Sequence, residues 1–368
     1  MKHIVPILQF AIDEHEISQN PDFSTLDKMY EGRVAYYGDY HAHSNSGGRS
    51  DGKVTLEGWL ERMKELHIDF AGMMDHRQVR HMYLDEFDHE YFICGTEPAG
   101  EYIEPYLRLH YLMIFEERDA LGKILEAFPD VFEYTGAVDG VFDGVFEYKA
   151  VERERFMEVV KAVRDIGGVF VHAHPRQVMV SDNIEDFYFG DGTVIETIYT
   201  NRYDYPHNID TINNYLLWLQ FLDSGKKIYN TATADCHRAV SNQALNTVYS
   251  DEKNGAAYVR KLRDGDLNAG FIGIKMCIDD APVGSTTKYK DGMKLYLKIE
   301  DSHPLLYNPD EKYRVDVFSD KGLAYSAPLT MPFSVAINVR KRRFYRVEII
   351  RDEDGSPASI GNPIWIED

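Results

Sequence analysis

Residues 36–52 read YYGDYHAHSNSGGRSDG, an aromatic run that ends in two histidines and continues into a loop rich in serine and glycine. The two histidines, His41 and His43, are one residue apart. In a strand, residues i and i+2 point to the same side, so both imidazoles can converge on one ion at the C-terminal end of this strand. A pair of histidines alone does not establish a metal site, so the other strands must supply further ligands.

Six other short runs of apolar, β-branched or aromatic residues have the character of buried strands. Amphipathic helical patterns lie between them; for example, Leu56, Trp59 and Met63 share one face after Thr55, a predicted N-cap. Strands that alternate with helices predict a β/α architecture with a parallel sheet, and seven such units are enough to close into a barrel. The predicted strands span residues 33–41, 69–75, 91–97, 107–115, 167–174, 193–200 and 226–235.

The pattern changes after about residue 280. The runs MKLYLKIED, KYRVDVFSD, PFSVAINV and RFYRVEIIRD alternate polar and apolar residues, with turn residues and no good helix between them. This alternation predicts a small antiparallel β-sandwich. We therefore predict an N-terminal extension over residues 1–33, an α/β domain with seven strands that can close into a barrel over residues 34–280, and a C-terminal β-sandwich domain over residues 281–368.

The charge of the chain is unevenly distributed. The formal net charge is −21, and residues 281–368 contain 13 basic and 13 acidic residues, so all the excess acid lies in residues 1–280. Such a surface disfavours long nucleic acids and anionic membranes as partners, because both need basic residues, and it is compatible with metal binding. The three scattered cysteines indicate a reducing compartment, and no signal peptide or membrane span is recognised. We expect a cytoplasmic protein whose oligomeric state is open.

The predicted strands of the first part share a second feature, because most of them end in side chains that bind borderline metals. Active sites of β/α barrels lie at the C-terminal ends of the strands, so these side chains would meet at one mouth of the barrel. A random scatter would not repeat this placement so often. The strand-end groups are Asp75 and His76, Glu97, His110, His172 and His174, Glu196, and Asp235 with His237.

Four motifs, HAHSNSGGRSDG, MDHR, HAHPR and DCHR, with GTE and LHYL between them, resemble those of the polymerase and histidinol phosphatase (PHP) superfamily of metal-dependent phosphoesterases. The resemblance covers roughly residues 34–280, and GDYHAHS and the terminal GNPIWIED are similar to a branch that appends a β-rich C-terminal domain. It implies a distorted seven-stranded barrel with two or three divalent ions. It also implies nine ligands: His41, His43, Asp51, His76, Glu97, His110, His174, Asp235 and His237.

The same resemblance divides these ligands among the ions. His41, His43, Glu97 and Asp235 would hold one ion, Glu97 would bridge to a second with His110 and His174, and Asp51, His76 and His237 would hold a third. Glycines in the loop would let Asp51 turn back to its ion. His172 could compete with His174, but the proline after His174 matches the family motif, which leaves His172 as a packing or supporting residue. Asp75 is a candidate supporting residue beside His76.

Such a site can activate a bound water and neutralise charge on a phosphoryl oxygen. Imidazole-rich ligation suits zinc, manganese or iron. A phosphate also needs cations, and guanidinium groups bind its oxygens bidentately. The leading hypothesis is therefore a metal-dependent phosphoesterase that acts on a small phosphorylated metabolite or a short nucleotide. We expect two or three of five arginines to face this substrate: Arg49, Arg77, Arg176, Arg202 and Arg238.

Two other functions remain open. The branch with the appended β-domain includes hydrolases of carbamates and esters, whose carbonyl group the same metal centre can polarise, and the arginines would then have less to do. A non-catalytic protein could use the barrel as a metal-stabilised scaffold and the β-domain as a binding module, although the intact ligand set speaks against this.

Overall fold

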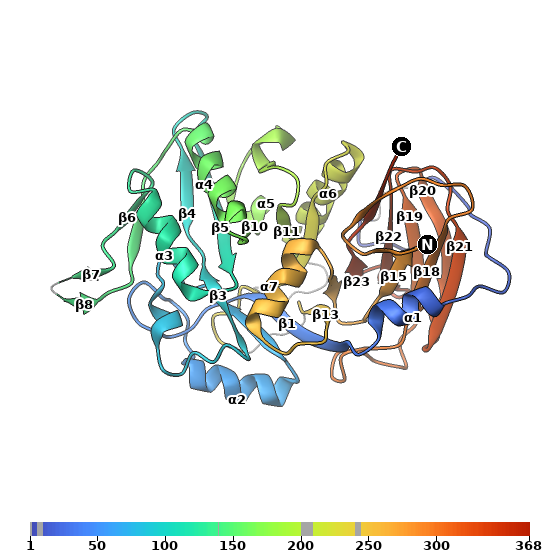
Figure 1. The fold of residues 1–368 in the computed structure, drawn as a ribbon, viewed down its shortest axis with the longest axis horizontal. Coiled ribbons are helices and arrows are strands. Elements are labelled where there is room, and N and C mark those ends of the chain that lie inside the picture. Colours follow the sequence, from blue (N-terminus) through green and yellow to red (C-terminus); the bar gives the residue numbers. More distant parts are fainter. Residues whose placement is uncertain (1, 6–9, 139, 200–208, 240–243) are drawn as a thin grey trace.

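The computed structural model describes residues 2–5, 10–138, 140–199, 209–239 and 244–368, so Arg202 lies outside the described residues. Within them the chain is a mixed α/β structure with seven α-helices: α1 (Ser24–Tyr30), α2 (Leu56–Leu66), α3 (Arg118–Ala127), α4 (Arg153–Asp165), α5 (Pro175–Val178), α6 (Ile209–Asp223) and α7 (Gly255–Asp264). The helices from α2 to α7 lie around the strands of the first part, and strands dominate the other end of the molecule (Figure 1). None of the helices in the described part of the chain has the length and hydrophobicity that a membrane crossing needs.

All seven predicted strands of the first part are present in one large sheet. They are β1 (Val34–Ala42), β2 (Phe70–Met73), β3 (Phe92–Thr96), β5 (Leu107–Phe115), β10 (Val169–Ala173), β11 (Val194–Tyr199) and β12 (Tyr229–Thr233). Their hydrogen-bonded order is β12-β11-β10-β5-β3-β2-β1. The predicted start of helix α2 is also present, since the side chain of Thr55 accepts a hydrogen bond from the Gly58 amide.

Strand β5 corrects the prediction of a parallel sheet, because it runs antiparallel to both of its neighbours, β3 and β10. Only residues 97–106, which include the short strand β4 (Ala99–Tyr102), separate β3 from β5. A parallel return needs a crossover of about a dozen residues or more, so β5 folds directly back on β3. The N-terminal half of β5 therefore lies at the edge where β3 and β10 end, and His110 pairs with Ala173 there.

The two outermost strands of this series, β1 and β12, meet through the loop after β12. Ala42 forms an isolated parallel bridge with Cys236, and the His43 amide donates to the Cys236 carbonyl oxygen at 3.0 Å. The buried carboxylate of Asp39 accepts from the amides of His41 and Ala234, at 2.9 and 3.0 Å. The hydrogen-bonded ladder itself continues from β1 to β13 (Asn246–Ser250), so closure of the seven strands into a barrel stays a prediction.

The C-terminal part consists of two sheets whose strands pair antiparallel, except that β17 pairs in parallel with β24. Beyond β13 the large sheet continues through β14 (Asn268–Gly270), β23 (Pro357–Gly361), β22 (Phe344–Arg351), β19 (Tyr313–Ser319) and β20 (Gly322–Pro328), with β17 (Thr286–Lys288) and β24 (Ile364–Glu367) beside it. The second sheet has the order β16 (Ala281–Pro282), β15 (Lys275–Ile278), β18 (Lys294–Ile299), β21 (Phe333–Asn338). Both sheets contribute to one apolar cluster that includes Met276, Leu295, Val317 and Val347. Because the large sheet joins this part to the first and β15 precedes residue 280, a separate sandwich over 281–368 remains a prediction.

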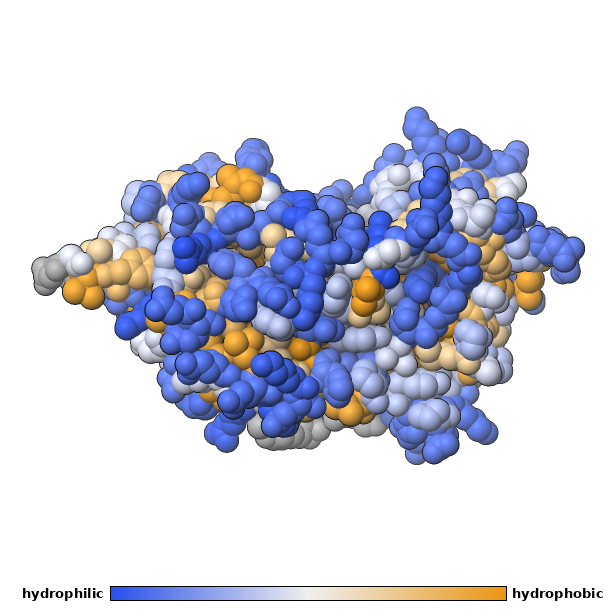
Figure 2. All heavy atoms as spheres, turned by 60° about the horizontal axis from the view of Figure 1, so that its bottom comes forward, coloured by the Kyte–Doolittle hydropathy of each residue, from blue (hydrophilic) through white to orange (hydrophobic). Residues whose placement is uncertain are grey.

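A narrow ribbon between α3 and α4 projects from the first part. It contains β6 (Phe132–Tyr134) paired with β9 (Phe146–Tyr148), and β7 (Ala137–Val138) paired with β8 (Val141–Phe142) at its tip. Figure 2 shows a largely hydrophilic face with hydrophobic residues on this tip, where Val141 is 70% exposed. The base of the ribbon returns to the chain after β2, because the Phe146 amide donates to the Arg77 carbonyl oxygen at 2.9 Å.

The predicted N-terminal extension lies along the C-terminal strands. Ile12 forms a parallel bridge with Leu323, and Ile17 forms an antiparallel bridge with Ile337. Asp13 is the charged anchor of this contact, since its carboxylate accepts from the Ser319 hydroxyl at 2.7 Å and from the Arg342 Nε at 2.7 Å. The hydrogen bond from Arg342, followed in importance by burial that acts in the opposite direction, holds the pKa of Asp13 below its ordinary value.

Replacement of Asp13 by asparagine is therefore expected to lower the free energy of unfolding by about 1–3 kcal/mol at pH 7, the range for a hydrogen bond to a charged group. Since the pKa of Asp13 is lower in the folded state, its contribution is present above the unfolded-state pKa and is lost as the pH falls. The difference between the two proteins should shrink in urea titrations as the pH is lowered below about 4. Glu14→Gln, which changes an exposed neighbour, is the control. Equal changes in the free energy of unfolding for both variants would contradict this role of Asp13.

Candidate metal centre

The predicted ligands come from the ends of six strands and meet at one edge of the sheet. His41 lies near the end of β1, and Glu97 directly follows β3. His76, after β2, forms an isolated bridge with Glu97, which fixes these two chain segments side by side. The antiparallel direction of β5 brings His110 to the same edge. The remaining ligands follow β1, β10 and β12: His43 and Asp51, then His174, and finally Asp235 and His237.

Glu97 lies at the centre of the cluster, and only 1% of its side chain is exposed. Its Oε2 lies 3.2 Å from His41 Nε2, 3.4 Å from His43 Nε2 and 3.1 Å from His76 Nδ1. Its Oε1 lies 2.9 Å from His110 Nδ1 and 3.2 Å from His174 Nε2. The two oxygens of one carboxylate therefore face two different sets of imidazoles.

Two aspartates complete the groups. Asp235 Oδ1 lies 2.9 Å from His43 Nε2 and 3.4 Å from His41 Nε2. Asp51 Oδ1 lies 3.1 Å from His237 Nε2 and 3.6 Å from His76 Nε2. His41 and His43 are fully buried, whereas the Asp51 side chain is 50% exposed, so the cluster has a buried floor and an open rim.

All nine predicted ligands belong to groups whose donor atoms lie within 4.8 Å of one another. Two ligand atoms that share an ion at about 2.0–2.1 Å with a tetrahedral angle lie about 3.3 Å apart, which matches most of these separations. The imidazole and carboxylate donors also suit zinc, manganese or iron. The groups are His41, His43, Glu97 and Asp235; Glu97, His110 and His174; His43, Asp51, His76 and His237; and His41, His174 and Glu196.

At His43 and Glu97 burial disfavours the charged form, yet contacts with neighbouring groups favour it. Burial lowers the pKa of His43, but hydrogen bonds to Asp235 and Glu97 outweigh burial and raise this pKa to about 10. Burial would raise the pKa of Glu97, but the charges of His41 and His76 hold it well below its ordinary value. A carboxylate set that attracts protons onto buried imidazoles in this way can attract a cation in their place.

The backbone is strained at the same place. His174 and Asp235 have φ values of 26° and 46°, and Arg77, next to His76, has a φ of 50°. Residues other than glycine rarely adopt positive φ, and such conformations persist only where the surrounding structure enforces them. Two of them within the cluster and a third beside it support its interpretation as a functional site.

Glu196 is a residue of the cluster that the predicted ligand set omits. Its Oε1 lies 2.7 Å from His41 Nδ1, and its Oε2 accepts from the His174 amide at 2.7 Å. A separation of 2.7 Å is that of a hydrogen bond and is too short for two ligands of one tetrahedral ion. We therefore interpret Glu196 as a residue that orients His41 and the backbone of His174. The available signal was its position at a strand end in TVIET.

Tyr199 is a second omitted residue, and its hydroxyl donates to Asp235 Oδ2 at 2.7 Å, which leaves Oδ1 to face the histidines. Glu196 and Tyr199 are three residues apart and would point to opposite faces of a regular strand. The register of β11 against β12 shifts between Glu196 and Ile198, which allows both side chains to contact the cluster.

Asp75 and His172 lie near the cluster and have different structural roles. Asp75 accepts from the Ser44 amide and the Ser44 hydroxyl, both at 2.7 Å, so it fixes the start of the loop after β1. His172 is buried against the rings of Phe187 and Phe189. Burial, followed by the charge of His174, lowers the pKa of His172 to about 3, as expected of a neutral packing residue.

The four described arginines of the predicted substrate site are differently placed. Arg49 and Arg77 both form ion pairs with Glu147. Arg176 donates to the Ser181 carbonyl oxygen and lies over the ring of Phe187. Arg238 is exposed and follows the predicted ligand His237.

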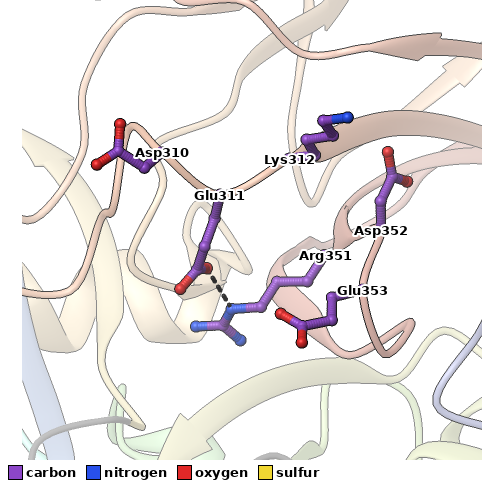
Figure 3. A pocket seen from close by; sticks show the side chains of 6 residues that line it. All are labelled: Asp310, Glu311, Lys312, Arg351, Asp352 and Glu353. Atoms are coloured by element: carbon purple, nitrogen blue, oxygen red, sulfur yellow. Dashed lines mark hydrogen bonds and ion pairs between the residues drawn. The ribbon is translucent and has the colours of Figure 1, made fainter.

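A hollow of about 350 Å³ in the C-terminal part is separate from the cluster. Its residues lie just before β19 and at or just after the end of β22. In Figure 3 the guanidinium of Arg351 points toward Glu311, and the distance from Arg351 Nε to Glu311 Oε2 is 3.2 Å. None of these residues belongs to a potential metal group within the described part of the chain. The lining residues are Asp310, Glu311, Lys312, Arg351, Asp352 and Glu353.

No protein-family model and no curated protein matches the sequence. Among solved structures, a protein of Bifidobacterium adolescentis provisionally described as a metal-dependent phosphoesterase is similar with a TM-score of 0.35 and 16% identity over 54% of this chain and 87% of that chain. An amidohydrolase from Chromobacterium violaceum has a TM-score of 0.34 and 15% identity over 56% of this chain and 89% of its own. Endonuclease Q, in complex with a duplex that carries an abasic lesion, has a TM-score of 0.40 and 12% identity over 62% of this chain and 57% of its own. These likenesses are too weak to assign a function, so the site is interpreted from its own contacts.

Proposed function

We propose that this protein is a metal-dependent hydrolase of the PHP type, and more specifically a phosphoesterase that acts on a small phosphorylated metabolite or a short nucleotide. The observation that carries the proposal is Glu97, whose Oε2 and Oε1 face separate sets of buried histidines, with His41 Nε2 at 3.2 Å and His110 Nδ1 at 2.9 Å. A carboxylate shared between two imidazole-rich groups suits a hydrolytic site with more than one ion.

Under this proposal the nine clustered residues hold two or three ions of zinc, manganese or iron. Such ions, when bound, supply Lewis acidity and lower the pKa of a coordinated water to about 7. The residues of the chain decide the direction of approach: His41 and His43 are buried, whereas His76 and His237 are 25% and 30% exposed. A substrate would therefore approach across His76, His237 and Asp51, where Arg77 and Arg49 are close along the chain.

We further propose that residues 34–280 form this metal domain as a distorted seven-stranded barrel, and that residues 281–368 form an appended β-sandwich domain. The backbone hydrogen bonds of Cys236 with His41 and His43 support closure at the mouth, and the apolar cluster between the two C-terminal sheets supports the second unit.

One observation favours a carbamate or ester hydrolase as the second candidate. Arg49 and Arg77 both form ion pairs with Glu147, so a carboxylate of the protein itself already pairs with these two cations. An ester substrate would have less need of free arginines, and the same ions could polarise its carbonyl group.

A comparison of two chromogenic substrates tests the proposal. Purified protein supplied with Mn²⁺ is expected to release phosphate from an aryl phosphate faster than it cleaves the matching aryl ester, and a chelator should stop the reaction. Faster cleavage of the ester would favour the second candidate. A chelator that lowers the melting temperature of a protein without turnover of either substrate would instead support a metal-stabilised scaffold and contradict the enzyme.

A further inference from the structure

The contact between Glu147 and two arginines is unusual for its charge balance. Glu147 Oε2 accepts from Arg77 Nη1 at 2.9 Å, and Glu147 Oε1 forms an ion pair with Arg49. The side chains of Arg49, Arg77 and Glu147 are 45%, 30% and 39% exposed. Two guanidinium groups thus share one carboxylate, and a net positive charge remains on a surface that solvent reaches.

The two arginines are held in place by the segments that carry the metal ligands. Arg77 follows His76 and has a positive φ of 50°, a conformation that persists only where the surrounding structure enforces it. The Arg49 amide donates to Gln78 Oε1 at 3.0 Å, which joins the loop after β1 to the segment after β2. Gly48 permits this approach, since a Cβ at that position would lie 2.3 Å from Gln78 Oε1.

Glu147 is brought to these arginines by the ribbon, and it does not improve the pairing of the ribbon strands. Glu147 of β9 lies directly opposite Glu133 of β6, and like charges in opposite positions of an antiparallel pair are destabilising. Its role is therefore its contact with the arginines.

We propose that Arg49 and Arg77 form an anion site for the phosphoryl group of the substrate, and that the Glu147 carboxylate occupies this site until the substrate replaces it. Two guanidinium groups can bind several oxygens of a phosphoryl dianion, whereas one carboxylate brings a single charge. An exposed ion pair contributes little stability, so the exchange costs little. The ligand class is thus a terminal phosphoryl group, and this inference rests on the proposed phosphoesterase function.

The test compares Glu147→Gln with Glu133→Gln, which removes the same charge from the opposite strand of the same ribbon. Calorimetric titration of the metal-loaded protein with inorganic phosphate is expected to give a dissociation constant about five-fold lower for Glu147→Gln than for the wild type, the change that corresponds to an exposed ion pair of about 1 kcal/mol. Glu133→Gln should change it by less than about two-fold. The double variant Arg49→Gln/Glu147→Gln should lose the gain.

Equal affinities of the two single variants, or weaker phosphate binding by Glu147→Gln, would overturn the anion site. Phosphate binding is measured without turnover, so its outcome is separate from that of the proposed function. If the protein hydrolyses aryl phosphate but Glu147→Gln leaves its affinity for phosphate unchanged, the proposed function is supported and this inference is contradicted. If the protein is inactive toward aryl phosphate but Glu147→Gln binds phosphate more tightly as predicted, the anion site is supported and the proposed function is contradicted.

Discussion

Replacement of Glu97 by glutamine is expected to remove bound metal and to lower kcat/KM by more than about 100-fold, because even residues that only support a metal ligand cost about 10–100-fold. The carboxylate of Glu97 lies within 3.4 Å of five imidazole nitrogens, from His41, His43, His76, His110 and His174. Glutamine has nearly the same shape but carries no charge and offers one oxygen. It can therefore serve one of the two groups at most.

Elemental analysis of the purified variant measures this loss directly, and phosphate release from an aryl phosphate measures its consequence. Glu90→Gln is the matched control, since Glu90 lies before β3, at the opposite end from Glu97, and pairs with the surface residue Lys253. Excess Mn²⁺ should not restore Glu97→Gln, because a ligand is missing. A variant that retains the full metal content and activity of the wild type would contradict the central role of Glu97.

The positions of the clustered residues followed from a local property of the sequence. A strand that ends in His, Asp or Glu delivers that side chain to the edge of the sheet, and this rule located His41, Glu97 and Asp235 without knowledge of the sheet order. His110 was also assigned to the cluster, although it lies within its predicted strand. The assumed direction of β5 was wrong, and its antiparallel direction is what brings His110 to this edge. In each group the donor atoms of these residues lie within 4.8 Å of one another. Their role as metal ligands stays a prediction.

The parts that could not be predicted depend on contacts between distant segments. The direction of β5 follows from the short connection between β3 and β5. This connection contains β4, which pairs with β5 but has no strong strand pattern in the sequence. The contact of Arg49 and Arg77 with Glu147 depends on the return of the ribbon, and Glu147 lies 70 residues after Arg77 in the chain. Sequence periodicity reports which face a residue occupies and carries no information about such pairings.

Replacement of Glu196 by glutamine is expected to weaken metal binding about 10–100-fold without abolishing it. The carboxylate accepts at both oxygens, from His41 Nδ1 and from the His174 amide, each at 2.7 Å. A proton held on Nδ1 leaves the lone pair of His41 Nε2 for an ion. Glutamine has one accepting oxygen, so one of these two buried donors must lose its partner.

This defect differs in kind from that of Glu97→Gln, because every ligand is still present and only its orientation is disturbed. Mn²⁺ titrations followed by activity should therefore show a shifted midpoint for Glu196→Gln and recovery toward the wild-type rate at saturating metal. Thr197→Val is the control on the same strand, since its hydroxyl contacts only the Ile195 carbonyl oxygen among the bonds described, at 3.4 Å. If saturating Mn²⁺ failed to restore Glu196→Gln, Glu196 would have to be counted as a ligand, and the 2.7 Å contact with His41 would need another explanation.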